Sequence, residues 1–352
     1  MTSVAALAVL FFSQGADKPV ELGRKFTLGE KLTYVTRAQF TEEQRSGMLQ
    51  TFIPEDFEMS YRHTIEVKKM KADGIAEILY TRPHMTIVTG DTGESQAKST
   101  VEKLDWKLQL DVSPINEVLE MKDLNPPKKD TAPKAGDGLR NSLRFIGQQS
   151  QTDGIALSLL FEFVGEVQRT AFFVGSLDTG LDLAPKTPFE EVQKGSTWKR
   201  TVGYSPQKLK GRGDKVAVQR MDYTYEYQGI TKSKEGKDVY RIQAKVKLDT
   251  DLIEFAKQLA GSTGSFLKSV PLKLDATIDF DLDINTMHMV KAVASSEGSF
   301  SIMPKGAEQA AVEDRFKGRT TVKLESRTLT VSAKPPVVAP KTKGKGKASG
   351  RI

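Results

Sequence analysis

Polar and apolar side chains alternate along most of this chain, and no other feature of the sequence constrains the fold as strongly. Side chains on a β-strand point to opposite faces in turn, so strict alternation marks a strand with one wet and one buried face. The clearest examples are Met59–Val67, Leu104–Val112, Tyr240–Leu248 and Leu272–Ile284. Strands of a doubly wound parallel sheet would be apolar on both faces. The pattern therefore predicts long antiparallel strands.

Turn-forming residues separate the alternating segments. Ala72–Gly74 and Lys234–Lys237 each predict a hairpin turn. Two short helices are also expected. Ser113 and the proline after it form a good start for a helix over Ile115–Leu124, and Asp249–Leu259 places its apolar residues on one helical face. We therefore predict a mainly β (α+β) protein of large curled antiparallel sheets with a few short helices.

The two halves of the chain echo one another. Phe26–Tyr34 and Val192–Arg200 each contain an apolar residue, a turn at a glycine and the start of a strand at an aromatic residue. This echo suggests an internal duplication into two halves. The expected organisation is a signal peptide over 1–16, a β-rich half over 17–124, a linker and connecting segment over 125–185, a second β-rich half over 186–332 and a disordered basic tail over 333–352.

The N-terminus predicts export. Val4–Phe12 is an unbroken apolar run, and the first charged residue is Asp17. Nine residues are too few to span a bilayer, which needs about 20, but they match the hydrophobic region of a secretory signal. A buried N-terminal strand or helix is the alternative, because Met1–Ser3 carries no lysine or arginine. The absence of cysteine excludes disulfides and thiolate chemistry and suits a periplasmic, cell-surface or extracellular protein of a bacterium.

The net charge of +7 belongs mainly to the tail. Six cations without any acid lie between Ala333 and Ile352, which leaves +1 for the rest of the chain. We therefore expect no specific nucleic-acid binding by the folded body. The tail is suited to electrostatic contact with anionic lipid or wall polymer, and a merely solubilising end is the alternative interpretation.

Several of these motifs together resemble a known family. They are the Phe-x-x-Gly-Glu-Lys-x-x-Tyr opening at 26–34, the Ala-Asp-Gly hairpin at 72–74, the Lys-Gly-Ser-Thr-Trp segment at 194–198 and Phe-Asp-Leu-Asp at 280–283. The chain resembles an uncharacterised family of exported bacterial β-rich proteins, a domain of unknown function, over roughly residues 22–332. The resemblance implies a cell-envelope location and β-rich architecture, with no catalytic residues to carry over. A fainter analogy is to periplasmic lipoprotein carriers, in which a curled antiparallel sheet shelters acyl chains.

The sequence Asp-Thr-Gly occurs twice, beginning at Asp91 and at Asp178. Two such loops meet in aspartic proteases, where paired carboxylates share a proton. The residues before Asp91 are not a hydrophobic strand end, and Asp-Thr-Gly is also ordinary turn chemistry. The two aspartates are therefore remote catalytic candidates, and the chain is more consistent with a protein that is not an enzyme.

No metal or cofactor site is predicted. The histidines His63, His84 and His288 lack the spacing of a zinc site, and alternation places His63 on a buried face. Asp279, Asp281 and Asp283 follow the alternation of a strand and fit its wet face better than a calcium loop. We expect these aspartates to pair with cations of a neighbouring strand.

Five apolar or aromatic residues are the candidates for ligand contact: Trp106, Met221, Tyr223, Tyr225 and Tyr227. The last four share one face of a strand. Tyrosines that line a cavity suit an amphiphilic ligand, whereas a packed core is the alternative interpretation. The sequence thus favours a non-enzymatic binding or carrier protein for lipid or another hydrophobic ligand. The alternatives are a structural or adhesive envelope protein anchored by its basic tail and, remotely, an aspartic-type peptidase.

Overall fold

The computed structural model describes residues 18–46, 51–90, 98–125, 184–204, 219–254 and 267–330. Within these ranges nearly all regular structure is β-strand, accompanied by one short 3-10 turn and two helical residues at 253–254. The strands are β1 (Glu30–Ser46), β2 (Ile53–Met70), β3 (Ala76–Gly90), β4 (Lys98–Val112), β5 (Val118–Asp123), β6 (Thr197–Tyr204), β7 (Gln219–Lys232), β8 (Asp238–Asp251), β9 (Leu267–Ser269), β10 (Pro271–Asp283), β11 (Met289–Pro304) and β12 (Val312–Leu329).

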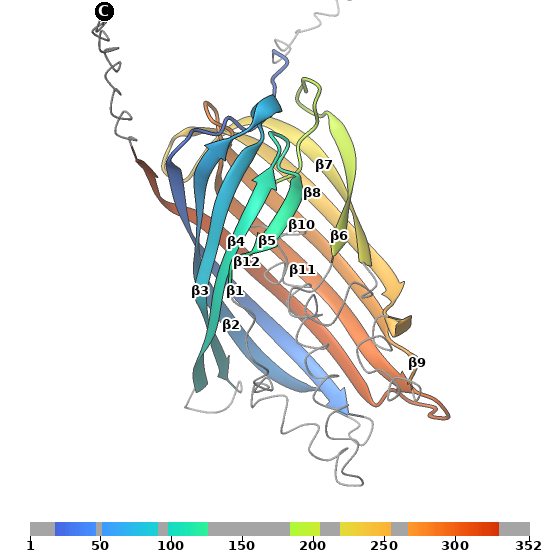
Figure 1. The fold of residues 1–352 in the computed structure, drawn as a ribbon. Coiled ribbons are helices and arrows are strands. Elements are labelled where there is room, and N and C mark those ends of the chain that lie inside the picture. The colour runs from blue at the N-terminus through green and yellow to red at the C-terminus, as the bar shows by residue number, and fades with distance from the viewer. Residues whose placement is uncertain are drawn as a thin grey trace, which may run out of the picture.

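These strands form one large antiparallel sheet. The hydrogen-bonded order is β5-β4-β3-β2-β1-β12-β11-β10-β8-β7-β6, and the short β9 pairs with β11. Each half of the chain supplies a run of sequential neighbours, and the two runs are joined by pairing of β1 with β12 along the whole of β1. Figure 1 shows the sheet strongly twisted and curled, with the N-terminal strands in blue to green and the C-terminal strands in yellow to red. The predicted mainly β, antiparallel architecture is confirmed.

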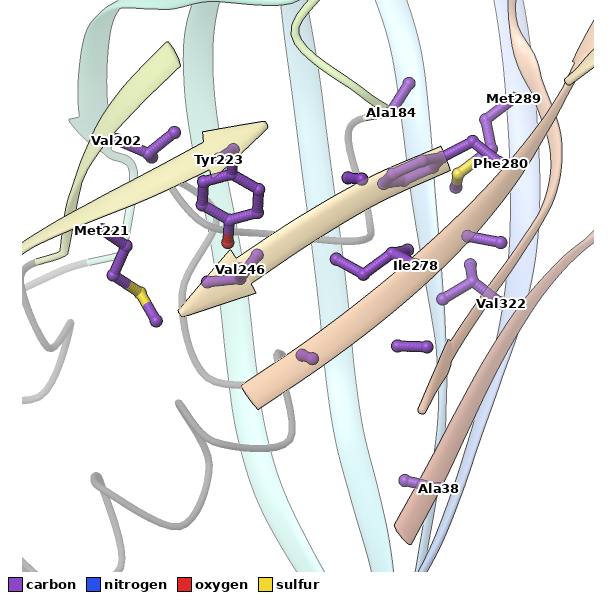
Figure 2. Packing of buried hydrophobic residues seen from close by; sticks show 14 of the residues in the cluster. Ala38, Ala184, Val202, Met221, Tyr223, Val246, Ile278, Phe280, Met289 and Val322 are labelled. Atoms are coloured by element: carbon purple, nitrogen blue, oxygen red, sulfur yellow. The ribbon is translucent and has the colours of Figure 1, made fainter. Parts of the chain in front are cut away.

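One face of the sheet is buried, and we call it the inner face. On β10 the inner-face side chains are the alternating apolar residues predicted from the sequence: Leu272, Leu274, Ala276, Ile278, Phe280 and Leu282. Burial of a side chain such as Ile278 contributes about 1.5–3 kcal/mol. Buried apolar residues from all the long strands come together in one cluster, part of which Figure 2 shows from close by, including Ala38 of β1 and Val246 of β8. The alternation thus reflects a single curled sheet.

The opposite, outer face carries charge. Arg241 of β8 donates to Asp281 of β10 at 2.8 Å, and Lys247 lies 2.9 Å from Asp275 on the same two strands. Of the three aspartates predicted to pair with cations of a neighbouring strand, Asp281 does so, and Asp283 accepts hydrogen bonds from its own turn instead. Gln243, between those cations, donates to Asp279 at 2.9 Å.

Both predicted hairpin turns are present. The turn η1 (Ala72–Gly74) connects β2 to β3, and Gly74 has φ of 71°. The second turn lies between β7 and β8, where the Ser233 amide donates to the Lys237 carbonyl at 2.8 Å. Gly236 in that turn has φ of 78°, a conformation that glycine adopts without steric cost.

The helix predicted over Ile115–Leu124 is wrong. Ser113 instead opens a tight turn, in which its amide donates to the Glu117 carbonyl and its hydroxyl accepts from the Glu117 amide. The chain then forms β5, whose Met121 pairs with Leu110 of β4. Pairing with an exposed strand edge outweighs the local helix-start signal, because most helical stability comes from tertiary packing.

The helix predicted over Asp249–Leu259 begins four residues before the first helical residue, Ile253. Asp249 and Asp251 still belong to β8, where they pair with Lys273 and Pro271 of β10. Only then does the Asp251 carboxylate accept from the Ile253 amide at 2.9 Å, at the start of the two helical residues. Asp251 therefore begins the helical turn. The remainder of this predicted helix, from residue 255, lies outside the described residues.

Two irregular segments cross one end of the sheet, which we call the closed end. The first is residues 18–29. It bridges to Val192 through paired backbone hydrogen bonds of Val20, both at 2.9 Å, and it donates from the Arg24 amide to the Pro114 carbonyl at 2.7 Å. The next amide, that of Lys25, donates to the Thr286 carbonyl at 3.0 Å. The segment therefore ties the β4–β5 turn to the β10–β11 turn.

The second segment, residues 184–192, is a strap that links the two edge strands of the sheet, β5 and β6. Asn116, in the β4–β5 turn, donates its side-chain amide to the Pro185 carbonyl at 2.8 Å. The Trp198 indole of β6 donates to the Lys186 carbonyl at 2.8 Å. The edge strands β5 and β6 do not pair with one another within the described ranges, so at the closed end the strap connects them.

Candidate ligand-binding face

The centre of the inner face is built from small side chains. A cross-strand row connects Ala38 to Thr320, Thr320 to Ala294, Ala294 to Ile278 and Ile278 to Ala244. Together with two neighbours on β10 and β11, these small residues form what we call the small-residue patch: Ala38, Ala244, Ala276, Ala294, Ser296 and Thr320. All six are buried. Because these side chains are short, the volume above the backbone has to be filled by other side chains or by a ligand.

The predicted tyrosine stripe lies beside this patch on β7. Met221, Tyr223, Tyr225 and Tyr227 are all buried on the inner face. Tyr225 stacks on Trp198 of β6 at 5.5 Å between ring centroids and on Tyr223 at 5.7 Å. Burial raises the pKa of the Tyr223 and Tyr225 hydroxyls, which therefore remain neutral. The stripe offers flat apolar rings with neutral polar tips.

Trp106, the fifth candidate, lies on β4, near the other end of the strand order from β7. It is half-buried on β4, where the guanidinium of Arg82 sits 4.5 Å from its ring. The same guanidinium lies 4.1 Å from the ring of Tyr61, and Arg82 donates to the Tyr80 hydroxyl at 2.8 Å. Trp106 and the β7 stripe both pack against the common cluster, but they come from opposite ends of the strand order. The site residues predicted from the sequence are thus divided between two walls.

His63 is buried among aromatic rings, as the alternation predicts. It stacks on Tyr34 at 5.0 Å and on Tyr80 at 5.5 Å, and it meets Tyr61 in a tilted contact at 5.9 Å. Tyr34 in turn donates its hydroxyl to the Met289 carbonyl at 2.9 Å. These contacts link the inner face of β1–β3 to β11.

A buried polar group at the closed end was missed by the sequence analysis. Arg24 is 4% exposed, and its guanidinium carbon lies 4.4 Å from the ring of Phe26. No acceptor among the described residues lies within hydrogen-bonding distance of its Nε or Nη2. Burial lowers the pKa of Arg24, while the nearby Tyr34 and Glu30 act in the opposite direction. Arg24 is therefore a desolvated cation held beside the inner face of β1.

The other ionisable groups at the closed end form a partly compensated set. Glu30 is 1% exposed and accepts from Arg327 Nε at 2.7 Å through Oε1, whereas its Oε2 has no hydrogen-bond partner among the described residues. His288 is buried, and its Nδ1 shares a hydrogen bond with Thr286. Burial lowers the pKa of His288 to about 4; Asp283 raises it, and the two arginines lower it further. Hence His288 is neutral near pH 7 and supplies no compensating charge.

Two hollows, with volumes of about 810 and 920 Å³, lie on the part of the sheet away from the closed end. Their common lining includes Thr41, Asp275, Glu297 and Lys317, all of them exposed outer-face residues. These shared residues favour water and ions over an apolar ligand. The first hollow is also lined by Ala276 and Ser296 of the small-residue patch, and the second by the buried Leu274 and Phe316, so both hollows reach inner-face residues. The inner face, with its apolar and aromatic side chains, is the candidate site for a hydrophobic ligand.

Asp91 and Asp178 lie outside the described residues, so the peptidase alternative stays a prediction. The same holds for the signal segment, the connecting segment up to residue 183 and the basic tail. In the described part of the chain, no cluster of three histidine or acidic residues is placed to hold a metal ion. No helix there has the length and apolarity that a membrane crossing needs.

No protein-family model matches this chain, and no curated protein matches its sequence. Among solved structures, one that describes lipid–protein interactions in lipovitellin is similar to this chain, with 10% identity and a TM-score of 0.39; the match covers 88% of this chain and 26% of that one. The chain thus spans about a quarter of the lipovitellin chain.

Two bacterial structures are more remote. A domain named for outer membrane lipoprotein sorting, from Vibrio parahaemolyticus, has 7% identity and a TM-score of 0.14, covering 85% of this chain and 87% of that one. A DUF1329 family protein from Desulfovibrio piger has 8% identity and a TM-score of 0.13, with the same coverage. Similarity at this level assigns neither a family nor an activity. The family resemblance carried by the turn motifs stays a prediction.

Proposed function

We propose that this protein is an exported, non-enzymatic binding or carrier protein whose inner face receives a hydrophobic ligand such as a lipid. The observation that carries the proposal is the division of one continuous sheet into a charged outer face and an apolar inner face. That inner face is centred on the small-residue patch. A face of this kind recognises apolar chains by area and excludes water, without needing a catalytic group.

The composition of the patch supports a binding role. A sheet that only packs against itself is filled best by large branched side chains, as β10 is at Leu272, Leu274 and Ile278. Alanine at 38, 244, 276 and 294 contributes little volume in the middle of the face. Aromatic rings on β7 and on β4 flank this region on two walls. A long apolar chain is the class of ligand that fits small side chains bordered by rings.

The proposal is tested by narrowing the inner face at one position. Ala276 is buried on the inner face of β10, whereas Thr277, the next residue, points to the outer face. The variant Ala276→Phe should lower the affinity for the neutral dye N-phenyl-1-naphthylamine by about tenfold, and the matched control Thr277→Phe should leave it unchanged.

The measurement is a fluorescence titration of the delipidated full-length protein, with thermal melting to establish that both variants are folded. Mass spectrometry of an organic extract of the undelipidated protein should also show a co-purified amphiphile. A wild-type protein that binds no dye and yields no amphiphile would overturn the proposal. Equal affinities of the two folded phenylalanine variants would show that the dye binds elsewhere.

A further inference from the structure

One edge of the Arg24 guanidinium has no hydrogen-bond acceptor among the described residues. Nε and Nη2 point their N–H bonds to the same side and form the fork that takes a carboxylate side-on. The chain uses this fork elsewhere. Arg62 donates from Nε to Glu325 Oε2 at 2.9 Å and from Nη2 to Oε1 at 2.6 Å, whereas Arg241 donates from the same two nitrogens to one oxygen, Asp281 Oδ1, at 2.8 Å each. In Arg24 the same two nitrogens are buried and lack an acceptor among the described residues.

The carboxylates described at the closed end are already engaged by other groups. Arg24 and Arg327 are two cations at the closed end, and Glu30 already binds Arg327 through one oxygen. Asp283 directs its Oδ1 to the Thr286 hydroxyl and to two backbone amides of its own turn. His288 is neutral near pH 7. Glu30 acts on Arg24 through space, but none of the described carboxylates bonds to Nε or Nη2 of Arg24, so an anion of suitable shape would gain two charge-assisted hydrogen bonds there.

We propose that Arg24 binds the anionic head of an amphiphile, with a carboxylate as the best-fitting head group, at the closed end of the inner face. This inference rests on the proposed function, because the apolar tail of the same ligand would lie along that face. Two parallel charge-assisted hydrogen bonds from Nε and Nη2 match the two oxygens of a carboxylate. The ligand class is therefore a long-chain fatty acid or a lipid with a comparable head group.

The placement along β1 suits such a ligand. Glu30 and Tyr34, which act electrostatically on Arg24, lie at the start of the inner face of β1. Ala38 in the small-residue patch lies eight residues beyond Glu30, about 26 Å along the strand at 3.3 Å per residue. A head group at Arg24 thus directs an extended acyl chain toward the patch from the side where the sheet is closed by residues 18–29 and the strap.

The test compares two ligands that share a chain and differ in charge. Delipidated full-length protein is titrated by calorimetry with hexadecanoate and with hexadecan-1-ol at pH 7.5. Wild type should bind hexadecanoate about tenfold or more tightly than the alcohol. Arg24→Gln should abolish this preference while leaving the affinity for the alcohol within about twofold. Arg62→Gln, which removes the same fork from the outer face, is the matched control and should keep the wild-type preference.

A second variant guards against a purely structural effect of Arg24. Glu30→Gln removes the carboxylate that competes for the cations at the closed end, so it should increase the preference for hexadecanoate over hexadecan-1-ol. A residue with only a packing role would not produce opposite changes in Arg24→Gln and Glu30→Gln. Melting curves are recorded for each variant without ligand, and if Arg24→Gln does not fold, the comparison is made with Glu30→Gln and with Arg24→Lys, which keeps the charge and loses the fork.

The outcomes separate this inference from the proposed function. If wild type binds both ligands equally, or if folded Arg24→Gln retains the preference, the role of Arg24 is refuted while the binding function stands. If neither ligand binds, both proposals fail. Acetate and inorganic phosphate are titrated as well: binding of either as tight as that of hexadecanoate and dependent on Arg24 would mark a small-anion site and overturn the amphiphile proposal.

Discussion

Replacing Gly318 by alanine should destabilise the sheet, because the ring of Phe40 occupies the place of the new methyl group. Gly318 of β12 pairs with Phe40 of β1, and a Cβ at residue 318 would lie 1.9 Å from Phe40 Cδ1 and 2.4 Å from Cγ. Carbon atoms pack at about 3.5–4.0 Å, so the ring must retreat by roughly 1.5–2 Å. Overpacking of this kind costs about 1–3 kcal/mol, which outweighs the 0.4–1 kcal/mol that alanine gains by restricting the unfolded chain.

The assay is urea-induced unfolding followed by tryptophan fluorescence. Gly23→Ala is the matched control, because its Cβ would meet its nearest neighbour, Glu21 Oε1, at an ordinary 3.5 Å. In a Phe40→Ala background the cost of Gly318→Ala should largely disappear, giving a coupling energy of about 1 kcal/mol or more. The reasoning is refuted if Gly318→Ala is as stable as wild type, or if the two substitutions are additive.

Three further predictions concern polar contacts. Burial lowers the pKa of His288 to about 4, below its unfolded value near 6.5. The free energy of unfolding should therefore fall as the pH drops from about 6.5 to 4, because the unfolded chain then binds a proton that the folded chain does not. In His288→Asn, urea unfolding over the same pH range should show a smaller decrease. Arg241→Met should cost about 1–3 kcal/mol in urea unfolding because it leaves the buried Asp281 carboxylate unpaired, whereas Lys247→Met on the exposed end of β8 should cost much less. Asn116→Ala should loosen the strap, because it removes the hydrogen bond to the Pro185 carbonyl and because alanine tolerates the φ of 63° less well than asparagine. Trypsin should then cleave the variant faster than wild type, and an equal cleavage rate would contradict this.

The strands and their buried faces could be predicted because alternation is local information. The inner-face pattern of β10 and the burial of His63 both follow from counting by twos along the sequence. The end of β8 shows the limit of that information. Asp249 and Asp251 have the composition of a helix start, but their backbone groups pair with β10, a partner that the local sequence does not reveal. Partner strands decide where a strand ends.

The closed end could not be predicted, because its residues have no periodic pattern. Arg24 precedes Lys25 in a segment without strand alternation, where an arginine is expected to lie in solvent. Its burial results from contacts with Pro114 and Phe26 and from the approach of His288, which lies more than 260 residues away in the sequence. The tyrosine stripe on β7, by contrast, was visible from the sequence, since its period of two identifies the face that carries it.

The pairing of β1 with β12 has a consequence for biogenesis. Glu30 meets Leu329 and Ser46 meets Val312, so the edge of the earliest strand must wait for the last strand to be synthesised. Until then a nascent chain exposes a long hydrogen-bonding edge, which is a template for aggregation. Such a chain completes its sheet only after β12 has been synthesised, at the slow rate of a topology dominated by distant contacts. A chaperone that shields β1 during this delay would therefore raise the yield of native protein.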